Sequence, residues 1–135
     1  MLEHDAYILL NLISGIGPSR TASLIQKCGS ATAIFEERWE ALAGIRGISE
    51  ELARKIVEAA HSSMLDEELD RIALGGVEVV TRADAAYPEQ FGNMEDAPLC
   101  LYICGTLPET IGTQSIAIVG SRRATVYGMR MAQHI

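Results

Sequence analysis

The chain has 135 residues, 48% of them hydrophobic, and a formal net charge of −7 at pH 7. This length supports one modest hydrophobic core or two small ones, and the composition is that of a soluble globular protein. The sequence shows no secretory signal and no apolar stretch long enough to cross a bilayer, so we expect a cytoplasmic protein without a membrane partner. An acidic chain is not expected to coat nucleic acid over its whole surface.

Residues 2–60 are predicted to be all-helical, because apolar residues recur there at helical spacing. Within this region, "GIGPSRTASLIQ" begins at residue 15 and "GISEELARKIVE" begins at residue 47. Both segments place a glycine, an isoleucine and a small residue before a helix whose apolar pair falls at the same offset. We interpret them as two similar helical hairpins, 32 positions apart.

The first hairpin turn combines Gly15, Gly17 and Pro18. Glycines permit backbone conformations closed to other residues, and proline suits the first turn of a helix. The turn resembles the helix-hairpin-helix motif, in which backbone N–H groups bind a nucleic-acid phosphate, and Arg20 stands beside it. Gly15, Gly17 and Arg20 are therefore a candidate secondary phosphate contact. Packing of a small helical domain explains this hairpin equally well.

In the second hairpin, Gly47 keeps the turn and Ser49 is predicted to cap the next helix. That helix opens with Glu50 and Glu51, which repel phosphate. For this hairpin we favour a packing role over phosphate binding.

The segment after residue 61 changes from helix to strand character. A helix is predicted from Ser62 or Ser63 to the Gly75-Gly76 pair. Strands are predicted at 77–81 and 99–105, with a turn or short helix at 87–91. The three cysteines, Cys28, Cys100 and Cys104, lack zinc-site spacing and are expected to be small buried hydrophobes in a reducing compartment.

The last twenty residues form the only net-positive segment of the chain. Residues 116–135 hold three arginines and no acidic residue, whereas residues 1–80 and 81–115 are both net negative. The run "IAIVG" (116–120) is typical of a buried strand in a parallel sheet, and a helix is predicted from about residue 124. A turn between such a strand and helix directs free N–H groups outward. We therefore predict a phosphate site at Gly120, Ser121, Arg122 and Arg123.

Two longer segments resemble the bacterial DNA-processing protein A family (DprA, also called Smf). They are "DAAYPEQFGNMEDAPLCLYICGTL" (84–107) and "IAIVGSRRATVYG" (116–128), whose order and spacing are those of the family. Ala97-Pro98 stands where the family often has two prolines. The resemblance implies an α+β fold: a helical SAM or helix-hairpin-helix-like domain (1–61) and the first part of a Rossmann-like domain (62–135).

The resemblance also implies a function. It implies single-stranded DNA binding and protection in natural transformation, with loading of the recombinase RecA, and it makes Gly120, Ser121 and Arg122 part of the DNA phosphate site. Arg123 follows by adjacency. The chain stops at Ile135, one helix after the turn, so we expect a fragment of the family's Rossmann domain. An apolar face around Ile116, Ile118 and Met131 would then be uncovered, and we expect a homo-oligomer.

No catalytic constellation stands out in the sequence. His4, His61 and His134 have no Cys, Asp or Glu at ligand or triad spacing, so neither a metal, a cofactor nor an enzymatic activity is predicted. Two alternatives remain open. One is a Rossmann-like enzyme that binds a nucleotide phosphate at the same turn. The other is a helical protein-interaction module, with Leu12, Trp39 and Leu42 as contact residues.

Overall fold

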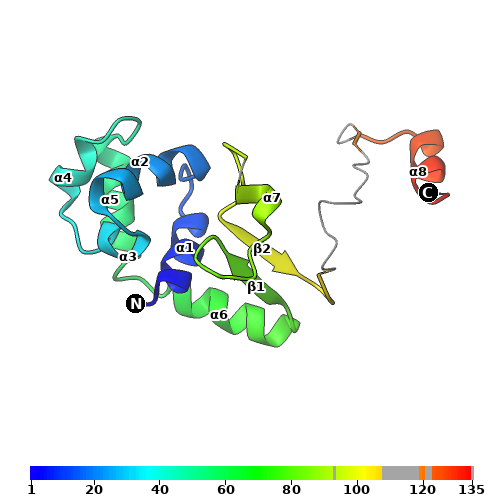
Figure 1. Ribbon diagram of the computed structural model, residues 1–135, viewed down its shortest axis with the longest axis horizontal. Coiled ribbons are helices and arrows are strands. Elements are labelled where there is room, and N and C mark those ends of the chain that lie inside the picture. Colours follow the sequence, from blue (N-terminus) through cyan, green and yellow to red (C-terminus); the bar gives the residue numbers. More distant parts are fainter. Residues whose placement is uncertain (93, 108–118, 121–122, 135) are drawn as a thin grey trace.

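The computed structural model describes residues 1–92, 94–107, 119–120 and 123–134. A helical N-terminal region is followed by a small two-stranded sheet, so the fold is α+β, as the sequence predicted (Figure 1). None of the described helices is long and apolar enough to span a membrane. The elements in chain order are α1 (Glu3–Leu12), α2 (Pro18–Cys28), α3 (Ala31–Ile34), α4 (Trp39–Ala43), α5 (Glu50–Ala59), α6 (Met64–Gly75), β1 (Glu78–Thr81), α7 (Glu89–Gly92), β2 (Cys100–Ile103) and α8 (Val126–Ala132).

Local sequence signals set most helix ends where they were predicted. Pro18 is the first residue of α2. The Ser49 hydroxyl accepts a hydrogen bond from the Leu52 N–H at 3.2 Å and so caps α5. Gly76, in the left-handed region at φ +59°, ends α6.

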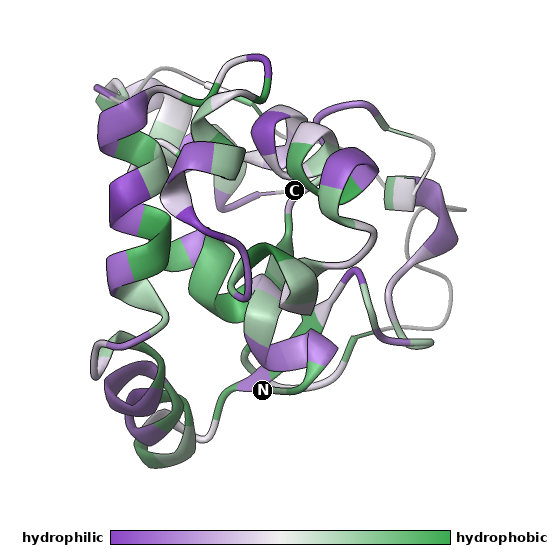
Figure 2. Ribbon diagram, turned by 90° about the vertical axis from the view of Figure 1, so that its left-hand side faces the viewer, coloured by the Kyte–Doolittle hydropathy of each residue, from purple (hydrophilic) through white to green (hydrophobic). Residues whose placement is uncertain are grey.

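The main hydrophobic core lies among the helices and includes side chains from every helix from α1 to α5. Figure 2 shows green, hydrophobic residues on the inward sides of these helices and purple, hydrophilic residues outward. The largest fully buried side chains of this core are Ile8, Leu9, Leu10, Leu24, Ile34, Leu42, Ile56 and Leu99.

Leu42, Cys28 and Cys104 differ in burial from what the sequence predicted. Leu42 is fully buried in the core and cannot serve as a contact residue for a partner, whereas Leu12 and Trp39 are half-buried. Of the cysteines, Cys100 is buried as expected, Cys28 is half-buried and Cys104 is exposed. Cys104 follows the last residue of β2, so its side chain lies past the covered part of the strand.

The sheet is an antiparallel pair in which Glu78 lies opposite Ile103 and Thr81 lies opposite Cys100. The sheet joins the helical core at the start of β2, because Leu99 and Cys100 pack in the same hydrophobic cluster as residues of α1. Helix α1 contacts α6 and both strands as well as α3. The core therefore continues past residue 61, and the domain boundary there stays a prediction.

Part of the predicted Rossmann-like unit lies outside the described residues. These positions include most of the expected strand at 116–120, with Ile116 and Ile118 of the expected apolar face. Met131, the third residue of that face, lies on α8 and is 43% exposed. The predicted C-terminal helix is confirmed as α8. The Thr125 hydroxyl caps the N-terminus of this helix by accepting a hydrogen bond from the Gly128 N–H at 3.1 Å.

Candidate nucleic-acid interface

The first hairpin turn joins α1 to α2 and is shaped by Gly15. Its φ of +94° lies in the left-handed region that favours glycine. The Ile16 N–H donates to the Ile13 carbonyl oxygen at 2.9 Å, and the Thr21 N–H donates to the Gly17 carbonyl oxygen at 2.9 Å as α2 begins. The turn is therefore a tight corner that places the start of α2 beside the end of α1.

The second turn repeats this geometry 32 positions later. Gly47 has a φ of +86°, the Ile48 N–H donates to the Ile45 carbonyl oxygen at 3.0 Å, and the Ala53 N–H donates to the Ser49 carbonyl oxygen at 2.9 Å. These positions correspond one by one to those of the first turn. The internal repeat predicted from sequence is thus a structural repeat of two helical hairpins.

Arg20 links the two turns. Its Nε donates to the carbonyl oxygen of Gly47 at 2.9 Å, and its Nη1 donates to the carbonyl oxygen of Gly15. Both acceptors are glycines with positive φ, so one guanidinium bonds to the positive-φ glycine of each turn. Arginine can make both hydrogen bonds because its planar guanidinium carries several donors in fixed directions, and a lysine ammonium lacks this geometry. Arg20, which the sequence predicted to contact phosphate, therefore stabilises the two turns through these hydrogen bonds.

The N-terminus of α2 opens into a shallow hollow lined by Gly17 to Arg20 and by Asp96. Gly17 precedes the helix in an extended conformation, and no side chain caps the helix. Uncapped N–H groups at a helix start attract anions. The Asp96 carboxylate brings a negative charge into the same hollow and opposes a bound phosphate.

The start of α5 differs, because its charges are already paired. Glu50 accepts from Arg54 at 2.9 Å and Glu51 accepts from Lys55 at 2.6 Å, each one helical turn along. The Arg54 guanidinium also lies 3.7 Å above the centre of the Trp39 ring. These contacts join α4 to α5 and agree with the packing role favoured for the second hairpin.

The predicted C-terminal phosphate turn is described only in part. Gly120 is exposed, and Arg123 is exposed two residues before the cap of α8, whereas Ser121 and Arg122 lie outside the described residues. Figure 1 draws α8 at the opposite end of the view from α2 to α5. No described contact joins Gly120 or Arg123 to the corner formed by Gly15, Gly17 and Arg20.

The segment 84–88 ("DAAYP"), which opens the first family-like run, attaches the sheet to the helices. Asp84 Oδ2 accepts from the Thr81 N–H at 2.6 Å and the Thr81 hydroxyl at 2.9 Å, and it lies 2.8 Å from His4 Nδ1 on α1. Partial burial alone would raise the pKa of Asp84, but these hydrogen bonds outweigh it and the pKa is lowered. The Tyr87 hydroxyl donates to the Pro98 carbonyl oxygen at 2.6 Å, just before β2. Sequence reasoning missed this role, since His4 and Asp84 are 80 positions apart.

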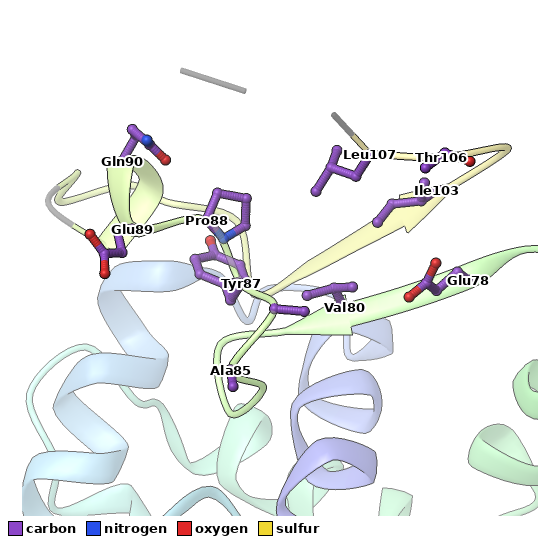
Figure 3. A pocket seen from close by; sticks show the side chains of 11 residues that line it. Glu78, Val80, Ala85, Tyr87, Pro88, Glu89, Gln90, Ile103, Thr106 and Leu107 are labelled. Carbon is purple, nitrogen blue, oxygen red and sulfur yellow. The ribbon is translucent and has the colours of Figure 1, made fainter. Parts of the chain in front are cut away.

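A larger hollow of about 490 Å³ lies against the outer face of the sheet (Figure 3). Val80 and Ile103 line it from the two strands, and Tyr87 and Pro88 line it from the motif segment. Its charged lining residues are Glu78 and Glu89, so this hollow is unsuited to phosphate.

The described residues offer no metal site of three or more His, Cys, Asp or Glu side chains. The buried thiol of Cys100 is also unsuited to nucleophilic chemistry. Burial, and secondarily the nearby Asp84 carboxylate, raise the pKa of Cys100 to about 12, so the thiol is protonated at neutral pH.

Comparison with known proteins finds a family match for two separate segments of the chain. Residues 78–135 match the family described as DNA recombination-mediator protein A, and residues 7–62 match the SAM-like helix-hairpin-helix tandem. The UvrABC system protein C of Agrobacterium fabrum (strain C58 / ATCC 33970) is 44% identical over 57 residues, which are 42% of this chain and 8% of that relative. No solved structure matches the chain. Residues 78–135 are thus a domain of the DNA recombination-mediator protein A family, preceded by a helix-hairpin-helix tandem.

Proposed function

We propose that this chain binds single-stranded DNA and that Gly120, Ser121, Arg122 and Arg123 hold its phosphates. The observation that carries the proposal is the family match, which spans this turn within residues 78–135. The family's printed description concerns DNA recombination, in which single strands are handled. Two hairpins of a helix-hairpin-helix tandem in the same chain support a nucleic-acid ligand.

The chemistry of the turn supports phosphate as the group recognised. Gly120 is exposed, and no described atom lies within 4 Å of the position that a Cβ would take, so a phosphate can approach the backbone closely. Paired arginines supply charge-assisted hydrogen bonds to phosphate oxygens. These contacts do not read base edges, so affinity depends on strand length and salt more than on sequence.

The resemblance implies two further parts of this proposal. The bound strand would be protected and passed to the recombinase RecA during natural transformation, and the chain would act as a homo-oligomer. Both are testable on the same oligonucleotide, by following RecA filament assembly with and without the chain and by measuring the mass of the complex.

The proposal is tested with the double substitution Arg122→Gln and Arg123→Gln. Fluorescence anisotropy with labelled oligothymidines of about 10, 20 and 40 nucleotides measures affinity across a salt series. We expect weaker binding at every length and a salt slope reduced by about 1.4, from about 0.7 per phosphate contact on single strands. Gly120→Val should weaken binding with both charges retained.

The control is the double substitution Lys55→Gln and Arg71→Gln. It removes the same charge from two cations that are already paired with glutamates. We expect parental affinity for this control. Unchanged affinity and salt slope in the Arg122/Arg123 variant would refute the proposal, and saturable binding of a mononucleotide with no dependence on strand length would favour a nucleotide-binding enzyme.

A further inference from the structure

A groove of about 630 Å³ runs between the C-terminal half of α2 and the turn that joins α4 to α5. Figure 1 shows these elements side by side in the helical region. The groove is lined by Ser23, Gln26, Lys27, Ala41, Gly44, Ile45 and Arg46. Its volume is in the range of ligand-binding clefts.

The only charged side chains in this lining are Lys27 and Arg46. Both are exposed, and within the described part of the chain neither forms an ion pair. Three other cations of the tandem are engaged, since Arg20 binds turn carbonyls and Arg54 and Lys55 pair with glutamates, whereas the exposed Arg38 does not line this groove. The tandem therefore leaves two unpaired cations facing one groove.

Neighbouring hollows do not share this character. Asp96 lines the hollow at the start of α2, and Glu58 lies beside Lys55 in a hollow between the ends of α1 and α5. Lys27 differs from the paired cations in sequence too, because no acidic residue stands three or four positions from it.

The uncharged residues that line the groove suit the phosphate backbone of a nucleic acid better than a protein segment. The exposed Gln26 amide is a neutral donor. Ser23 already donates to the Ser19 carbonyl oxygen at 3.2 Å. Apolar lining comes only from Ala41 and Ile45, which is little for anchoring the apolar side chains of a partner protein.

We propose that this groove binds the phosphate backbone of a nucleic acid through Lys27 and Arg46. The guanidinium contacts phosphate oxygens as a planar fork, and the ammonium acts as a point charge. The site lies on the helix-hairpin-helix tandem and is separate from the Gly120–Arg123 turn. It stands even if that turn binds nothing.

The test uses the full chain with Lys27→Gln and Arg46→Gln, which keep most of each side-chain stem. Both side chains are exposed, so we expect the circular dichroism spectrum and the melting temperature of the parent. Affinity for labelled single-stranded and duplex oligonucleotides is measured by anisotropy across a salt series. We expect about tenfold weaker binding and a salt slope reduced by about two phosphate contacts.

The Lys55→Gln and Arg71→Gln variant serves again as the control of equal net charge, and we expect it to bind like the parent. The proposed groove site would be overturned by equal losses in both variants, by no binding of the parent at low salt, or by equal affinity for polyglutamate of matched charge, which would assign the groove to acidic proteins. If the variant loses its fold, charge reversal at Lys27 alone must still weaken binding. If affinity falls when Arg122 and Arg123 are replaced but not when Lys27 and Arg46 are replaced, the proposed phosphate site at the C-terminal turn is supported and the proposed groove site is refuted.

Discussion

Replacing Asp84 is expected to weaken the junction between α1 and the sheet. Its Oδ2 atom receives hydrogen bonds from the backbone and hydroxyl of Thr81, at the end of β1, and from His4 on α1. Because a carboxylate only accepts hydrogen bonds, His4 Nδ1 is the donor in its contact. One oxygen therefore ties helix α1 to the end of strand β1, although His4 and Asp84 lie 80 positions apart in the sequence.

The magnitude follows from these three contacts. The Asp84 side chain is 29% exposed, so each hydrogen bond contributes on the order of 1 kcal/mol, and more where the acceptor charge is well shielded. Asp84→Ala leaves the Thr81 N–H and hydroxyl without their acceptor and should cost about 2–4 kcal/mol. Asp84→Asn keeps an acceptor oxygen but loses the charge and should cost about 1–2 kcal/mol.

The pH dependence of this contribution has a definite sign. The pKa of Asp84 is lowered in the folded state, whereas an unfolded aspartate has a pKa of about 3.9. The stabilisation is therefore complete above that ordinary value and is lost as pH falls through the folded-state pKa. The difference in unfolding free energy between the parent and Asp84→Asn should be constant near neutral pH and shrink in acid.

Urea denaturation followed by circular dichroism measures these free energies. Asp70→Asn, on the exposed face of α6, removes the same charge without removing a described hydrogen bond and should match the parent. A double-mutant cycle with His4→Ala should give a coupling of about 0.5 kcal/mol or more. If Asp84→Asn unfolds at the parental urea concentration, or if its difference from the parent does not shrink in acid, the proposed junction is refuted.

Three further predictions concern the helical tandem. Glu3 accepts from the Ala31 N–H at 2.6 Å and from the Thr32 N–H at 3.0 Å, so Glu3→Ala should lower the unfolding free energy by about 1–3 kcal/mol in urea; Glu36→Ala is the control. Arg20→Lys keeps the charge but cannot bridge both turns, so it should cost about 1 kcal/mol; unchanged stability would contradict the link. The buried Thr21 hydroxyl has no hydrogen-bond partner in the described part of the chain, so Thr21→Val should stabilise by up to about 1 kcal/mol, and a lower melting temperature would count against this.

Local sequence determined the elements and their ends. The two hairpin corners, the Ser49 cap, the α6 stop at Gly76 and the strands β1 and β2 all lie where the sequence predicted them. Each depends on the conformational preference of a glycine or proline, on a side chain that bonds its own helix start, or on the period of apolar residues. Such signals act within a few residues and need no knowledge of the tertiary packing.

Tertiary structure decided what the polar side chains do. Arg20 reaches the Gly47 carbonyl 27 positions away, Glu3 caps α3 from α1, and His4 pairs with Asp84. No spacing in the sequence predicts these partners. Glu3 and His4 meet theirs only when α1 packs against α3 and the sheet, and Arg20 meets Gly47 only because the two hairpin turns lie together. The same packing buries Leu42 and leaves Lys27 and Arg46 unpaired on one groove. Composition sets how many charges the chain carries, but the fold alone sets which of them remain available to a ligand, since pairing requires contact in space.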